Sequence, residues 1–129
     1  MFQGTQTSIV RTFSQADFDR FAQLSGDDNP IHTDPVFSAR TRFGRTVAHG
    51  LFLCGVLRGL IDKVVPGGRL TEQSMMFPAP TYAGDPMRFV VTVTSRSQGK
   101  AADQLDFEVE VMRVDDGVVT CQGHGKVVV

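Results

Sequence analysis

The sequence has few of the features that mark a secreted, membrane-bound or nucleic-acid-binding protein. It contains two cysteines, one tyrosine and no tryptophan in 129 residues, and its formal net charge is −1. Cys54 and Cys121 are far apart and have apolar neighbours, so we expect two reduced, buried thiols and no disulfide framework. A net charge so close to zero gives no electrostatic reason for binding nucleic acid or an anionic membrane surface.

Signals for secretion, membrane insertion and metal binding are also missing. The first ten residues lack a basic segment followed by an apolar stretch, so they do not predict a signal peptide. The longest uncharged apolar run, residues 46–57, is shorter than the roughly 20 residues that a membrane-spanning helix needs. No metal-binding spacing of the CxxC or HExxH kind is present. We therefore expect a cytoplasmic protein with no metal and no cofactor.

What the sequence does contain is the composition of an ordinary globular domain. It is 41% hydrophobic and 21% charged, and its length suits one domain with one hydrophobic core. Internal repeats, low-complexity segments and linkers are absent. We therefore predict a single domain that spans residues 1–129.

The first part of the chain has mainly helical signals. Residues 5–13 carry β-branched side chains and predict a short strand. Ser14, with Asp17 three residues later, is a capping signature for a helix that Gly26 can end. A second short helix is predicted over residues 34–44, because an aspartate and a proline stand at its start and a glycine at its end.

Residues 47–65 are apolar nearly all round, which predicts a helix enclosed by protein. Glycine weakens a helix by up to about 1 kcal/mol relative to alanine. We therefore expect other backbone to come close to the glycines of this segment, which are Gly50, Gly55 and Gly59.

From Arg69 onward the hydrophobic pattern changes from helical spacing to a period of two residues. This period predicts strands with one solvent-exposed and one buried face. The clearest alternation is in residues 87–94, 105–111 and 119–129. Turn signals separate these stretches at residues 97–103 and 115–117. One buried helix and one long antiparallel sheet predict an α+β fold in which the sheet wraps the helix.

The first candidate site is the motif SGDDNPIH at residues 25–32. Pro30 prevents a continuous helix and holds Asn29 extended, so we expect Asp27 and His32 on a fixed loop between two helices. An aspartate and a histidine that face one cleft can hold a water molecule and move its protons. The alternative is a simple turn with a surface histidine, and these residues alone leave both interpretations open.

The second candidate site is Ala48–Gly50, at the start of the predicted buried helix. Free N–H groups and the helix dipole there can stabilise a developing oxyanion, and Gly50 has no side chain to keep a carbonyl away. The alternative is a glycine needed for helix–sheet packing. His49 is either a ligand or a satisfied, half-buried histidine, and we favour the second; His124 is expected to be solvated.

These motifs together resemble those of the MaoC-like dehydratases, the (R)-specific enoyl-CoA hydratases. The hydratase signature is matched by Phe21, Ser25, Gly26, Asp27, Asn29, Pro30, His32, Asp34 and Ala39. The HG pair that follows it in the family is matched by His49 and Gly50, and a looser pattern by Gln73, Phe77, Pro80, Gly84 and Asp85. The resemblance runs from about residue 13 to residue 93, and the later strands match in pattern only.

The resemblance implies a hot-dog fold, a homodimer and an enzyme of fatty acid metabolism. The implied reaction is reversible hydration of trans-2-enoyl-CoA, or of a carrier-protein thioester, to the (R)-3-hydroxyacyl thioester. Asp27 and His32 would bind the added water, either one being the base, and the Gly50 amide would polarise the thioester oxygen. Two alternatives stay open: a hot-dog thioesterase, because fold does not fix function, and a non-catalytic subunit that binds acyl thioesters.

Overall fold

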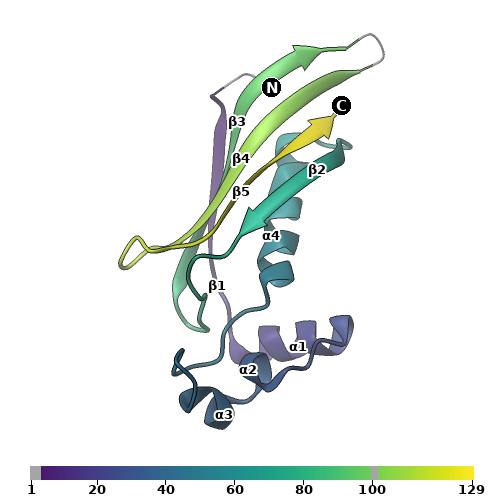
Figure 1. Ribbon diagram of the computed structural model, residues 1–129. Coiled ribbons are helices and arrows are strands. Elements are labelled where there is room, and N and C mark those ends of the chain that lie inside the picture. The colour runs from purple at the N-terminus through teal and green to yellow at the C-terminus, as the bar shows by residue number, and fades with distance from the viewer. Residues whose placement is uncertain (1–3, 100–101) are drawn as a thin grey trace.

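The computed structural model describes residues 4–99 and 102–129, which form a five-stranded antiparallel sheet and four helices (Figure 1). In chain order the elements are β1 (Gln6–Thr12), α1 (Gln15–Ser25), α2 (Pro30–Thr33), α3 (Pro35–Ala39), α4 (Gly50–Val64), β2 (Arg69–Met76), β3 (Pro86–Gln98), β4 (Asp103–Arg113) and β5 (Val119–Val128). The predicted α+β fold is confirmed. The turn predicted at residues 97–103 includes residues 100–101, which lie outside the described ranges.

The sheet has the strand order β1-β3-β4-β5-β2, so β1 and β2 form its two edges. The predicted alternation is confirmed in the central strands, whose buried residues are Met87, Phe89, Val91 and Val93 in β3 and Leu105, Phe107, Val109 and Val111 in β4. A register shift between β4 and β5 follows Val111, and Thr120 as well as Cys121 is buried there. Val129, predicted on the dry face, lies beyond the end of β5 and is exposed.

One face of α4 packs against the inner face of the sheet. Its buried residues recur with helical spacing, as Leu53, Leu57, Leu60, Ile61 and Val64. Cys121 is buried in the same core, whereas Cys54 is only partly buried, contrary to the prediction. Burial raises the pKa of the Cys121 thiol to about 12, with a smaller contribution from Cys54. Burial also raises the pKa of the Cys54 thiol, so both thiols are protonated at neutral pH.

The opposite side of α4 is open, and the prediction of a helix enclosed all round is wrong for the single chain. Leu51 is 74% exposed. A methyl group added at Gly55 or Gly59 would meet nothing within 4 Å, so no other backbone among residues 4–99 and 102–129 comes close to these glycines. The physical reason is that the sheet covers one face of the helix and, in the described part of the chain, nothing covers the other.

Helices α1, α2 and α3 lie together at the N-terminal end of α4 (Figure 1). The capping box of Ser14 and Asp17 is present, and Gly26 ends α1 with a φ of 80°. The second short helix is shorter than predicted: α3 ends at Ala39, where Thr41 Oγ1 donates to the Ser38 carbonyl over 2.7 Å. In the described parts of the chain, no helix has the length and apolar character needed to cross a membrane.

Candidate active site

His32 lies on the short helix α2, where the sequence predicted a loop. Asn29 is the N-cap of this helix and accepts a hydrogen bond from the Ile31 N–H over 3.1 Å, while Pro30 occupies the first helical turn. An asparagine N-cap followed by proline is a common way to start a helix. The same two residues that prevent α1 from continuing therefore begin a new helical turn, and that turn orients His32.

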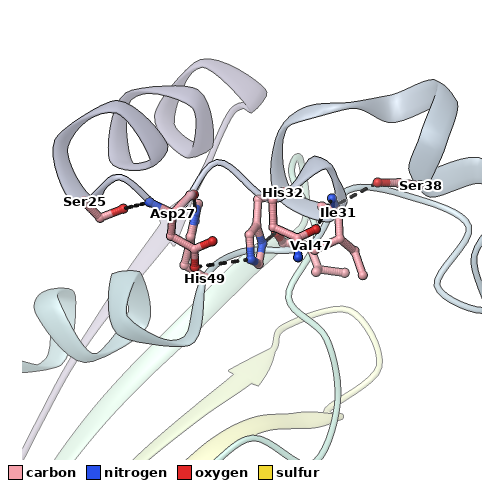
Figure 2. Close-up of polar contacts among 8 residues, drawn as sticks. Ser25, Asp27, Ile31, His32, Ser38, Val47 and His49 are labelled. Atoms are coloured by element: carbon pink, nitrogen blue, oxygen red, sulfur yellow. Dashed lines mark hydrogen bonds and ion pairs between the residues drawn. The ribbon is translucent and has the colours of Figure 1, made fainter.

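Asp27 and His32 face each other (Figure 2), which is one of the two arrangements that the motif left open. Asp27 Oδ2 lies 3.9 Å from His32 Nε2. The other ring nitrogen, His32 Nδ1, lies 2.7 Å from the Val47 carbonyl oxygen. A carbonyl oxygen only accepts hydrogen bonds, so Nδ1 carries the hydrogen and Nε2 is the basic nitrogen that faces the carboxylate.

The separation of this pair suits a bridging water molecule better than a direct contact. A distance of 3.9 Å is too long for a hydrogen bond, and a neutral imidazole Nε2 and a carboxylate are both acceptors. One water molecule can donate a hydrogen to each of them. The side chain of Asp27 is 57% exposed and that of His32 is 14% exposed, so water reaches the pair from the carboxylate side.

His49 completes this cluster, although the sequence favoured a satisfied, half-buried histidine. Its side chain is buried, and Nε2 lies 2.8 Å from the main-chain oxygen of Asp27. Its ring stacks on that of His32, with centroids 3.8 Å apart and planes inclined by 22°. Among the described residues, His49 Nδ1 has no hydrogen-bond partner, so the prediction is wrong on both burial and satisfaction.

Asp27, His32 and His49 offer three ligand atoms within 4.8 Å of one another. A metal ion needs the lone pair of each imidazole to point at it. The two imidazole rings are stacked with their planes inclined by 22°, which is a poor geometry for directing both in-plane lone pairs at one ion. The arrangement therefore suits proton transfer better than metal binding.

Three further side chains hold the site, and the sequence motifs did not reveal them. Gln15 Nε2 donates to the His32 carbonyl over 2.8 Å, and the Gln15 side-chain oxygen accepts from the Thr46 hydroxyl. The buried Ser38 donates to the Ile31 carbonyl over 3.2 Å. These residues act mainly on backbone carbonyls, which leave no signal in the sequence.

Gly50 is the first residue of α4, and its N–H has no acceptor within the described residues. A methyl group at Gly50 would lie 2.9 Å from the ring of Phe77, so the neighbour is an aromatic side chain and not the backbone that the sequence led us to expect. The glycine borders a cavity of about 420 Å³, lined by Arg42, Phe43, Val47, Ala48, Gly50, Leu53, Phe77, Pro78, Ala79, Pro80, Thr81 and Thr120. Asp27 and His32 are not among the residues that line it.

A larger hollow of about 610 Å³ lies on the other face of the sheet. His124 and Glu108 line it, and His124 is exposed, as predicted. Because the sheet separates this hollow from Asp27 and His32, the hollow is not part of the candidate site.

Comparisons with known proteins add an independent finding. A family model described as "MaoC like domain" matches residues 3–115. The (R)-specific enoyl-CoA hydratase of Aeromonas caviae is 36% identical over 99 residues, which are 75% of this chain and 74% of that protein. The 3-hydroxybutyryl-CoA dehydratase of Methylorubrum extorquens is 35% identical over 92 residues, which are 70% of this chain and 59% of that protein. The solved structure of the A. caviae (R)-hydratase involved in PHA biosynthesis matches with a TM-score of 0.89 and 29% identity, covering 98% of this chain and 96% of that chain.

Proposed function

The chain belongs to the MaoC-like domain family and has its hot-dog fold, and on this premise we propose that it hydrates trans-2-enoyl thioesters to (R)-3-hydroxyacyl thioesters, reversibly. The observation that carries the proposal is the Asp27–His32 pair, with two acceptor atoms 3.9 Å apart. The similar proteins are named as enoyl-CoA hydratases and hydroxyacyl dehydratases, which supports the same reaction.

The pair binds the water that is added to the double bond. The hydrogen on His32 Nδ1 is engaged by the Val47 carbonyl, so Nε2 is free to accept from water. The Asp27 carboxylate accepts the second hydrogen of the same molecule. Both hydrogens then point away from the substrate, and a lone pair of the oxygen is left to attack C3.

Gly50 supplies the electrophilic half of the site. Attack at C3 moves an electron pair onto the thioester oxygen, where a free amide at a helix N-terminus is well placed to stabilise it. One fixed amide donor of this kind contributes about 3–4 kcal/mol to the transition state. The N–H of Gly50 is free for this purpose in the described structure, and the missing side chain lets the oxygen approach.

The proton balance needs only one transferred proton. The base takes a proton from water as the C3–O bond forms, and the resulting enolate receives a proton at C2. The same side chain can return the proton that it took, while the other holds the water in place. Because both side chains lie on one side of the substrate, we expect syn addition; the reverse sequence dehydrates the 3-hydroxyacyl thioester.

We further propose that the acyl group is presented as a CoA or carrier-protein thioester to a homodimer. Within the described residues the two edge strands, β1 and β2, each pair on one side only, and unpaired edges are usually covered. The open side of α4, defined by Leu51, Gly55, Arg58, Gly59 and Asp62, borders the start of β2, because Arg58 Nη2 donates to the Gly68 carbonyl over 3.2 Å. A second chain at the β2 edge would cover this side of the helix as well.

Incubation with crotonyl-CoA tests the reaction. Hydration removes the absorbance of the conjugated enoyl thioester and leaves the thioester intact, and chiral analysis should give the (R)-3-hydroxy product. Release of free CoA thiol would instead indicate a thioesterase. Tight binding without either change would indicate a non-catalytic acyl-thioester-binding protein.

A further inference from the structure

We propose that His49 is a positioning residue that aligns the water-binding pair with the amide of Gly50. The proposal rests on the proposed hydratase function and adds a residue to it. His49 contacts the main chain of Asp27, the ring of His32 and, as its chain neighbour, the peptide unit of Gly50. A single residue therefore contacts both the pair proposed to bind water and the peptide unit proposed to bind the thioester oxygen.

The contact with Asp27 defines the tautomer of His49. Its Nε2 lies 2.8 Å from a carbonyl oxygen, which only accepts, so Nε2 carries the hydrogen and donates it. This bond fixes the backbone at Asp27, whose side chain is more than half exposed. In the described structure the Ser25 hydroxyl, which accepts from the Asp27 N–H over 3.1 Å, holds the other side of that residue.

The stacking contact restricts movement of the His32 ring, because His49 lies against one of its flat faces. The Val47 carbonyl holds one edge of the His32 ring, and the stacked ring of His49 covers one of its flat sides. His49 is itself held by Phe21, whose ring lies edge-on with centroids 4.7 Å apart. The side chain that faces the reacting water is thus fixed in two directions, by the Val47 carbonyl and by the His49 ring.

The environment of His49 differs from that of a histidine kept for stability. It is the N-cap residue of α4, yet its side chain makes no capping hydrogen bond. It turns toward Asp27 instead, and its Nδ1 remains buried without a partner among the described residues. Burying an unsatisfied acceptor is unfavourable, so the arrangement is better explained by what the ring orients than by what it stabilises.

Three substitutions separate the hydrogen bond from the stacked ring. His49→Ala removes both, His49→Gln keeps an N–H donor of similar reach, and His49→Phe keeps the ring without the donor. Misplacement of a catalytic group by about 1 Å can cost on the order of 100-fold in rate. We expect His49→Ala to lower kcat for crotonyl-CoA by about 10- to 100-fold with KM within about twofold, and His49→Gln, which keeps the donor, and His49→Phe, which keeps the ring, each to recover part of the loss.

A normal kcat in His49→Ala, or in His49→Phe, would overturn the proposal. Folded but equally inactive Ala, Gln and Phe variants would also overturn it, because they would indicate that the imidazole itself transfers protons. If His49→Ala does not fold, the comparison of the Gln and Phe variants decides alone. His124→Ala, which removes an exposed histidine on the outer face of the sheet, is the matched control for thermal melting and activity. Inactive wild-type protein would contradict the hydratase function itself, whereas active wild type with an active His49→Ala contradicts only the role of His49.

Discussion

The inner face of the sheet with α4 and the segment from Gly26 to His49 are built in opposite ways. The first is a layer of apolar side chains that bury one another, such as Leu57 and Phe89, both fully buried. The second is mostly exposed, and short polar contacts from Ser25, Asn29 and His49 to the main chain give it its shape. Burial of apolar area therefore stabilises the first region, whereas the conformation of the second depends on hydrogen bonds from a few residues.

If the proposed function is right, the difference teaches that stability and chemistry are assigned to separate parts of the chain. Leu57 can be described by the area that it buries, at roughly 25 cal/mol per Å². His32 cannot, because its contribution lies in where Nε2 points. Changes in the core should lower stability with activity per folded molecule retained, and changes in the segment should do the reverse.

The largest expected effect is at the acid–base pair. Asp27→Asn removes the charge and basicity of the carboxylate and His32→Ala removes the accepting Nε2, and acid–base groups typically contribute about 100- to 10,000-fold in rate. We expect kcat for crotonyl-CoA hydration to fall by at least about 100-fold and the melting temperature to change little. The separation of the two regions breaks down if either variant keeps near-normal turnover or unfolds.

A loss of similar size is expected at Gly50. The Gly50→Ala methyl would enter the space in front of the amide, and we expect kcat/KM to fall by at least about 100-fold. The melting temperature should stay nearly unchanged, since the added methyl meets only the outer end of the Phe77 side chain, which is 44% exposed.

Introducing Gly50→Ala into the Phe77→Ala protein tests whether the added methyl acts on the substrate or on the Phe77 ring. If it blocks the thioester oxygen, Gly50→Ala should lose as much activity in the Phe77→Ala protein as in the wild type. Recovery of activity in the double variant would mean that the methyl only displaces the Phe77 ring, and the oxyanion role of Gly50 would then be wrong.

Leu57→Ala tests the core side of the comparison. The residue is fully buried at the centre of α4, and leucine-to-alanine changes in cores cost about 2–5 kcal/mol of unfolding free energy. Denaturant unfolding should show this loss, while kcat per folded molecule stays close to that of the wild type. A large fall in kcat without a fall in stability would show that the core also shapes the site.

The smallest expected effect concerns the open side of α4, which belongs to neither region in the single chain. Gly59→Leu puts a better helix former where a side chain has room, so a monomer should gain up to about 1 kcal/mol. If a second chain covers this side, the leucine should instead weaken association. Sedimentation of this variant beside Gln23→Leu, an exposed change on α1, distinguishes the two, and a more stable, fully active monomer would contradict the dimer.

Much of this architecture could be predicted because its signals are local. The capping box of Ser14 and Asp17, the alternation in β3 and β4 and the glycine at position 26 depend on neighbours along the chain, and all three are confirmed. The helical turn at α2 was missed, although Asn29 and Pro30 carry its signal, because a proline can end one helix and begin another.

By itself, the sequence determined which residue types stand at the site and which face of each central strand is dry. Backbone dihedral preferences and hydrophobic periodicity act over a few residues and are written into their order. Only the tertiary structure decided that the Val47 carbonyl sets the tautomer of His32, that His49 stacks on it and that α4 has an open side. These contacts join segments that are distant along the chain, and their geometry comes from how the core packs, so no local pattern encodes them.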